Sequence, residues 1–133
     1  MIDFTQLKVW HKAHAVALEV YQITNHELRH DRTLAAQTRR AAGSVPTNIV
    51  EGCGTYSQRE LARYLQMALS SATELEYHLL LAHDLAYLAS SRYVRVRSQV
   101  QEVKRMLTSF LRTIRAREAK RREGKPKPDP SDT

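Results

Sequence analysis

The stretch His26-Glu27-Leu28-Arg29-His30 has the spacing of a zinc-protease motif. Two histidines four residues apart on a helix share one face and can bind Zn²⁺, and the glutamate between them can act as a general base. Glu51 is the candidate third ligand. A protease of this kind also needs a sheet edge to hold its substrate, and we see no strand in the sequence. We therefore interpret the two histidines as a surface pair, and we predict a non-enzymatic protein without a metal or cofactor.

Ser44 and Cys53 are the candidate nucleophiles. No nucleophile elbow or glycine-rich loop accompanies Ser44, and no catalytic partner is specified for Cys53. Cys53, between Gly52 and Gly54, is predicted to be a small buried side chain. Because one cysteine cannot form an internal disulfide, we predict a reducing, cytoplasmic location.

The uneven charge is the strongest functional signal. Residues 1–91 hold 8 Lys/Arg and 9 Asp/Glu, a net charge of −1, whereas residues 92–133 hold 13 Lys/Arg and 5 Asp/Glu, a net charge of +8. This asymmetry favours a polyanionic partner, with nucleic acid preferred over a membrane surface. A solvated helix face with a solubilising tail is the alternative. The candidate nucleic-acid-binding residues are Arg92, Arg95, Arg97, Lys104, Arg105, Arg112, Arg115, Arg117, Lys120, Arg121 and Arg122.

Composition predicts one soluble all-α domain. The hydrophobic fraction is 42%, and there are only four glycines and four prolines in 133 residues, which argues against a sandwich or barrel with many turns. No apolar run approaches the roughly 18 residues of a membrane span. The first ten residues, MIDFTQLKVW, do not resemble a signal peptide.

Hydrophobic periodicity predicts four helices. They cover about 6–28, about 34–51, 57 to about 86, and about 91–117, and Ser57 with Glu60 forms a capping box at the start of the third. Short links between long helices predict an up-down-up-down antiparallel four-helix bundle over residues 1–117. Two apolar stripes on the first helix hint at burial in the bundle and against another subunit. Residues 118–133 have no core positions and three prolines, and we predict a disordered basic tail there.

The apolar stripes of the third and fourth helices follow alternating spacings of four and three residues. The third stripe is Leu61, Leu65, Ala68, Ala72, Leu75, Leu79, Ala82 and Ala86. The fourth is Val96, Val100, Val103, Leu107, Phe110 and Ile114. Ala68, Ser71 and Ala72 make the middle of the third helix thin, so that a neighbouring helix can approach closely.

The segment AAGSVPTNIVEGCG, residues 41–54, contains Pro46 in an otherwise helical pattern. The helical phase continues through Pro46, so we predict a helix kinked there, with Ala42 and Gly43 relieving the crowding. An apolar stripe runs beside a polar one that contains Gln37, Ser44, Asn48 and Glu51. Ser44 and Asn48 either brace the kink, or the polar stripe forms an inter-subunit network or a ligand site. The candidate structural or oligomer-forming residues are Gln37, Ser44, Pro46, Asn48, Glu51 and Gly52.

Three motifs resemble one known family. They are Phe4-x-x-Leu7-x-Val9-Trp10, Gln37-x-Arg39-Arg40-Ala41-Ala42-x-Ser44-Val45-Pro46-x-Asn48-Ile49-x-Glu51-Gly52, and Ala68-x-x-Ser71-x-x-Glu74-Leu75-Glu76. Over about residues 4–115 the chain is similar to the four-helix-bundle proteins first seen encoded in intervening sequences of bacterial large-subunit rRNA genes. Val50 stands where the family usually has Ala, and Gly43 stands where it often has Val.

The resemblance implies a homopentamer of up-down bundles. The family includes proteins similar to the accessory variability determinants of diversity-generating retroelements, which bind a reverse transcriptase and nucleic acid through basic surfaces. We therefore expect non-specific RNA or DNA binding, with a reverse transcriptase as a further partner and no membrane partner. The alternative is a protein-interaction bundle, encoded in an rRNA intervening sequence, that has no nucleic-acid role.

Overall fold

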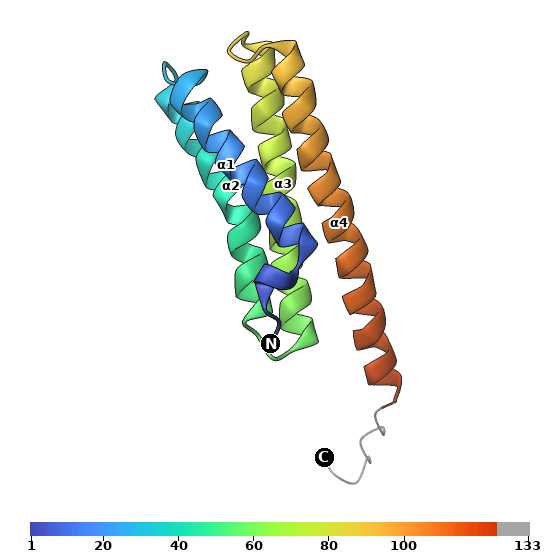
Figure 1. Ribbon diagram of the computed structural model, residues 1–133. Coiled ribbons are helices and arrows are strands. Elements are labelled where there is room, and N and C mark those ends of the chain that lie inside the picture. Colours follow the sequence, from blue (N-terminus) through green and yellow to red (C-terminus); the bar gives the residue numbers. More distant parts are fainter. Residues whose placement is uncertain (125–133) are drawn as a thin grey trace, which may run out of the picture.

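A computed structural model describes residues 1–124 and shows four α-helices in an antiparallel bundle (Figure 1). A short 3₁₀ turn, η1 (Phe4–Gln6), precedes α1 (Lys8–His26), α2 (Arg32–Cys53), α3 (Gln58–Asp84) and α4 (Ser90–Glu123). No strand occurs in this part of the chain. The prediction of an all-α up-down-up-down bundle is therefore confirmed.

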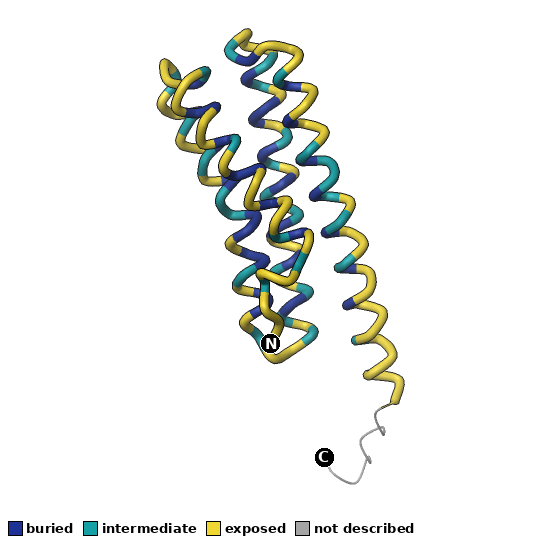
Figure 2. The backbone as a smooth tube through the Cα atoms, in the orientation of Figure 1, coloured by how far each residue is buried: buried dark blue, intermediate teal, exposed yellow. Residues whose placement is uncertain are grey.

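The predicted apolar stripes form one continuous core along the inner faces of the helices (Figure 2). On α1 the buried stripe includes Val9, Ala13, Val16 and Val20. The other stripe expected on α1, which includes Trp10, His14, Ala17, Tyr21 and Leu28, is covered only in part. Ala17 and Leu28 are buried, whereas His14 and Tyr21 are exposed and Trp10 is half-buried. The bundle alone therefore leaves part of this stripe outside.

Side-chain caps set the starts of two helices. The Asp31 carboxylate accepts a hydrogen bond from the Leu34 N–H at 3.0 Å, and the Ser57 hydroxyl accepts one from the Glu60 N–H at 3.3 Å. The second bond of a capping box would join the Glu60 carboxylate to the Ser57 N–H. Here the Glu60 carboxylate accepts hydrogen bonds from the guanidinium of Arg63 instead.

The third helix ends earlier than predicted. It ends at Asp84, and Ala86, expected in its buried stripe, is exposed and has a left-handed φ of 63°. The Tyr87 N–H donates to the Ala82 carbonyl at 2.9 Å, a bond that closes the last turn over a residue in this conformation. The apolar spacing of the sequence continues past the end of α3. Ala86 does not reveal the left-handed turn, because glycine is the residue usually found in that conformation.

α2 is helical throughout the segment that contains Pro46, and Pro46 is buried. Its predicted apolar stripe is confirmed by the burial of Leu34, Thr38, Val45 and Ile49. The predicted thinness of α3 is also confirmed, because Ala68 and Ala72 are fully buried.

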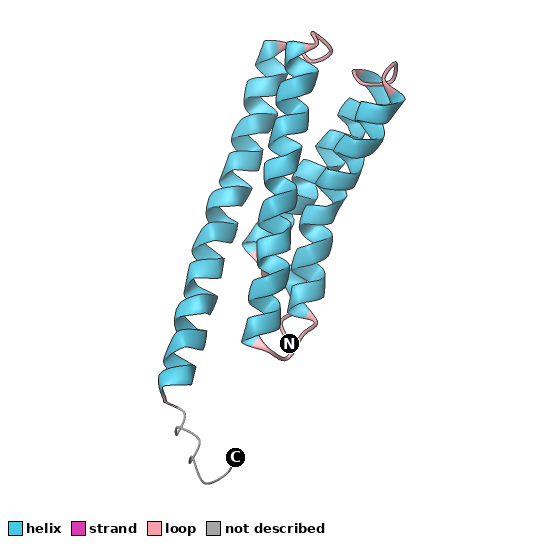
Figure 3. Cartoon of the chain, turned by 180° about the vertical axis from the view of Figure 1, so that it is seen from behind, coloured by secondary structure: helices cyan, strands magenta, loops and turns pink. Residues whose placement is uncertain are grey.

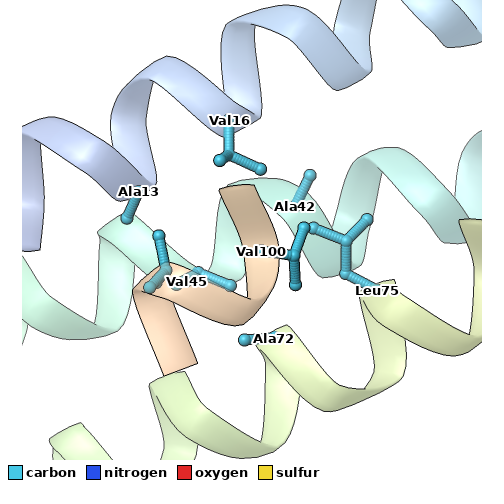
Figure 4. A pocket seen from close by; sticks show the side chains of 8 residues that line it. Ala13, Val16, Ala42, Val45, Ala72, Leu75 and Val100 are labelled. Carbon is cyan, nitrogen blue, oxygen red and sulfur yellow. The ribbon is translucent and has the colours of Figure 1, made fainter. Parts of the chain in front are cut away.

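Small residues from all four helices meet at the middle of the bundle. They surround an apolar cavity of about 10 Å³, close to the space of a single water, between residues such as Ala13, Ala42, Ala72 and Val100 (Figure 4). A cavity this small with no polar lining stays dry. The core is therefore closely packed where the helices cross.

The fourth helix was predicted to end at residue 117, which is wrong, because α4 continues to Glu123. Charged residues with good helix propensity extend the helix without core contacts. Figures 1 and 3 show from opposite sides that this end of α4 projects past the other helices. The rest of the predicted tail, residues 125–133, lies outside the described residues. Within residues 1–124, no helix combines the length and apolar character that a membrane crossing requires.

Candidate nucleic-acid interface

The most accessible cluster of cations lies on the last turns of α4. We call residues 115–123 the C-terminal overhang. All of them are exposed except Glu118, which is half-buried (Figure 2). The overhang holds five Lys/Arg and two Glu, a net charge of +3. A helix surrounded by solvent on nearly all sides can present these cations to a polyanion without moving the bundle.

Two of the predicted binding residues are instead engaged inside the bundle. Arg92 donates to the Glu27 carboxylate of α1 at 2.8 Å, and Lys104 donates to the Glu76 carboxylate of α3 at 3.3 Å. All four side chains are only 26–29% exposed. These pairs tie α4 to its neighbours, so Arg92 and Lys104 are poorly placed to contact a phosphate.

Four more of the predicted cations are themselves exposed and have either ion pairs of 3.3 Å or longer or a neutral partner. Arg95 lies 3.8 Å from Glu19, and Arg115 donates to the Gln66 side-chain carbonyl at 3.1 Å. Arg121 and Arg122 lie 3.3 and 3.5 Å from the Glu118 carboxylate. The guanidinium groups of these four residues keep an exposed side, from which a phosphate can also be bound.

The remaining five predicted cations have no ion pair within residues 1–124. They are Arg97, Arg105, Arg112, Arg117 and Lys120, and all five are exposed. Arg117 and Lys120 lie in the overhang, and Arg112 lies one turn before it. The sequence did not distinguish these five positions from the six whose side chains have partners.

The predicted polar stripe of α2 separates into two buried or half-buried side chains and two exposed ones. The Asn48 amide donates to the Ser44 carbonyl at 2.8 Å and to the Ser44 hydroxyl at 2.9 Å, and that hydroxyl is 2.9 Å from the hydroxyl of Ser71 on α3. Gln37 and Glu51 are exposed and lie outside this network. Ser44 and Asn48 therefore brace α2 against α3 within one chain, and the inter-subunit network or ligand site that would also include Gln37 and Glu51 stays a prediction.

Gly52 of α2 lies close to side chains of α3. A Cβ atom there would lie 3.0 Å from the Cβ of Tyr64 and 3.1 Å from a Cδ of Leu61. At Gly43 the nearest such atom is the Tyr21 hydroxyl oxygen at 3.8 Å. A side chain at Gly52 would therefore require Tyr64 or Leu61 to shift by a few tenths of an ångström.

The histidines of the zinc-protease motif do not share a helix face. α1 ends at His26, whereas His30 follows the turn, and the Glu27 carboxylate is paired with Arg92. Glu51 lies near the far end of α2, about 28 Å along its axis from the start of that helix. Residues 1–124 contain no group of three His, Cys, Asp or Glu side chains placed to share a metal ion.

Cys53 is buried, as predicted. Burial raises the pKa of its thiol, and the negative charge of Asp3 raises it further. The Ile2 N–H donates to the Cys53 carbonyl at 2.9 Å, which holds the N-terminal residues across this end of α2. A thiol held in its neutral form is a poor nucleophile.

Sequence reasoning missed a basic residue outside the C-terminal third. Lys8, at the start of α1, lies beside Arg105 of α4 in a shared surface groove. It was overlooked because residues 1–91 are neutral as a whole. Only the tertiary structure shows that Lys8 adds to the positive charge of α4.

The fold and the site define a class: an up-down four-helix bundle whose fourth helix carries an exposed basic end. The model of the 23S rRNA-intervening sequence protein family matches residues 5–109, and the chain belongs to that family. The family model ends before the overhang begins, so the free cations near the end of α4 lie outside the matched residues.

A solved structure supports the fold. A protein of unknown function of the S23 ribosomal protein family from Bacteroides thetaiotaomicron matches with a TM-score of 0.70 at 23% identity. The match covers 77% of this chain and 97% of that protein. A comparison with curated proteins found no match.

Proposed function

We propose that this chain is a non-enzymatic, homopentameric accessory protein that binds RNA or DNA without sequence preference. Its most specific role is to scaffold a diversity-generating retroelement reverse transcriptase with its template RNA and cDNA. The observation that carries the nucleic-acid proposal is the exposed overhang of α4, with its net charge of +3 and its nearby unpaired cations.

Phosphate binding suits the chemistry of this surface. Lys and Arg side chains beside a nucleic-acid backbone release condensed counterions, which makes the binding strong at low salt and weak at high salt. The sequence carries no recognition-helix or RNA-binding motif that would indicate base readout. Binding without sequence preference is therefore the form that we propose.

The homopentamer and the reverse transcriptase partner are proposed from the resemblance described above. The part of the second α1 stripe that the bundle leaves outside, with Trp10 half-buried and Tyr21 46% exposed, supports a further contact between subunits. A ring would place five basic overhangs on one assembly and strengthen the local field for a polyanion. Light scattering that gives the mass of a monomer would contradict the pentamer.

The direct test measures binding of a fluorescent single-stranded RNA, and of DNA, by anisotropy at low and moderate salt. The variant Arg112→Glu, Arg117→Glu, Lys120→Glu removes three unpaired cations of α4. A matched variant, Arg29→Glu, Arg32→Glu, Arg59→Glu, changes the net charge equally elsewhere. We expect the first to weaken binding at least about tenfold more than the second, and to lower the salt slope by about 0.7 per lost phosphate contact.

Two outcomes would contradict nucleic-acid binding at this surface. One is no binding at low salt, and the other is equal loss in the two triple variants. The alternative of a protein-interaction bundle predicts that removing residues 118–133 leaves partner binding intact. Co-purification of a co-expressed reverse transcriptase with the full chain, and its loss with the α4 variant, tests the scaffold role separately.

A further inference from the structure

A groove lies between the start of α1 and the C-terminal half of α4. Its volume is about 440 Å³. We call it the α1–α4 groove, and its lining residues are Leu7, Lys8, Val9, Arg105, Met106, Ser109 and Phe110. It lies on α4 before the overhang begins and involves a different set of side chains, so it can serve a separate purpose.

The floor of the groove is apolar and partly exposed. Leu7, Met106 and Phe110 pack on the edge of the core but are not fully buried. The sequence pattern placed Phe110 in the core stripe of α4, whereas Leu111 occupies that position and is 3% exposed. Phe110 therefore contributes its ring to the groove, where an incoming apolar side chain can cover it.

The rim of the groove is positively charged. Lys8 and Arg105 are both exposed, and neither has an ion-pair partner within residues 1–124. Glu102, one turn earlier on α4, is 3.4 Å from Lys12 and is thus already paired. No carboxylate lines the groove, so nothing within it neutralises the two cations.

The start of α1 adds to this positive potential. Leu7 is the N-cap residue and supplies no side-chain hydrogen bond, and the first turn contains no acidic residue. The first N–H groups of a helix carry a partial positive charge that an acidic side chain normally offsets. At this end of the groove an acid would have to come from another molecule.

We propose that the α1–α4 groove binds an acidic amphipathic helix of a partner protein. On the partner's helix, apolar residues spaced at i, i+3 or i+4 and i+7 cover Met106 and Phe110. Asp or Glu residues that flank them on the same helix pair with Lys8 and Arg105. A phosphate backbone would gain nothing from the apolar floor. A second copy of this chain could occupy the groove only with an acidic helix, whereas the projecting end of α4 is basic. This inference does not depend on nucleic-acid binding.

The test uses a designed fluorescent peptide of about four turns, with Leu at the spacing given above and Glu on both flanks. A matched peptide carries Lys in place of every Glu. Anisotropy with the full chain should show binding of the Glu peptide at least about tenfold tighter than that of the Lys peptide. Equal affinity for the two peptides, or no binding of the Glu peptide, would overturn the proposal.

Variants of the full chain locate the binding. Ser109→Trp fills the groove from an exposed position, and Arg105→Glu reverses one rim cation. The matched controls are Ser98→Trp and Arg97→Glu, which change exposed positions of the first half of α4 in the same way. Circular dichroism confirms that each variant is folded. The two groove variants should each lose at least about tenfold in peptide affinity, and the controls should lose less than about twofold.

Three results would overturn the assignment. Equal loss in Arg97→Glu and Arg105→Glu would mean that only the net charge matters. A change of assembly mass in Ser109→Trp, measured by light scattering, would make the groove a contact between copies. Equal loss of RNA and peptide binding in Ser109→Trp would place the groove in the nucleic-acid site.

Discussion

The α2–α3 contact and the C-terminal overhang of α4 are built from the same helical geometry but use side chains in opposite ways. Between α2 and α3 the residues are small and close together, and the polar groups of Ser44, Asn48 and Ser71 bond to one another. On the overhang the side chains are long and charged, and they face solvent. Burial makes side-chain identity at the contact decisive for stability, whereas exposure leaves the overhang free to change without unfolding the bundle.

The largest difference in the free energy of unfolding is expected between the loss of a core side chain and the loss of an overhang side chain. Leu75→Ala removes a 1%-exposed side chain beside the central cavity and should lower the free energy of unfolding by about 3 kcal/mol. Arg117→Ala should change it by less than about 0.5 kcal/mol. Urea denaturation of both variants at one chain concentration measures the two changes. A large loss in Arg117→Ala would show that the overhang packs against something in solution.

Alanine substitutions at two glycines of α2 should change the stability of the protein in opposite directions. Gly52→Ala places a methyl group 3.0 Å from the Cβ of Tyr64 and should destabilise the fold by about 1–2 kcal/mol. Gly43→Ala meets only the Tyr21 hydroxyl at 3.8 Å and should stabilise the helix by about 0.5–1 kcal/mol. Thermal unfolding of the two variants is the measurement. Equal shifts of the two unfolding temperatures in the same direction would mean that the α2–α3 contact at Gly52 is loose enough to accept a methyl group.

The polar brace between α2 and α3 should have a smaller effect. Ser71→Ala removes one partner of the Ser44 hydroxyl and should cost about 0.5–1.5 kcal/mol. In a double-mutant cycle, Ser44→Ala and Ser71→Ala should be coupled by about 0.5 kcal/mol or more, because the two residues share this bond. Additive losses would contradict a direct interaction. Ser98→Ala, at an exposed position of α4, provides a reference with no expected change.

Much of the fold was predictable because local patterns and global packing agree. The apolar stripe of α2 and the Ser57 cap appear in the structure as the sequence indicated. The errors occur where neighbouring positions are equally apolar or where propensity alone extends a helix. Phe110 and Leu111 are adjacent apolar residues, and only the crossing of α4 over the core decides that Leu111 is buried.

The candidate site was predictable in part. The charge asymmetry identified α4, but a count of charges does not tell which cations are already paired. Arg92 and Lys104 have partners 65 and 28 residues away in the sequence. Such distant pairs leave no local signal. The α1–α4 groove was missed for the same reason, because Lys8 and Arg105 come from opposite ends of the bundle sequence.

By itself the sequence determined the four helices, the faces that they bury, the membership in an rRNA-intervening sequence family and the basic character of the last third. The helices, their buried faces and the basic character follow from periodicity, capping and composition, and the family membership follows from sequence motifs and the match over residues 5–109. All of these are local along the chain. The tertiary structure alone decided which cations are free, that Ser44 bonds to Ser71, and that Phe110 lines a groove. Each of these depends on the distance between side chains on different helices, and that distance is set by packing.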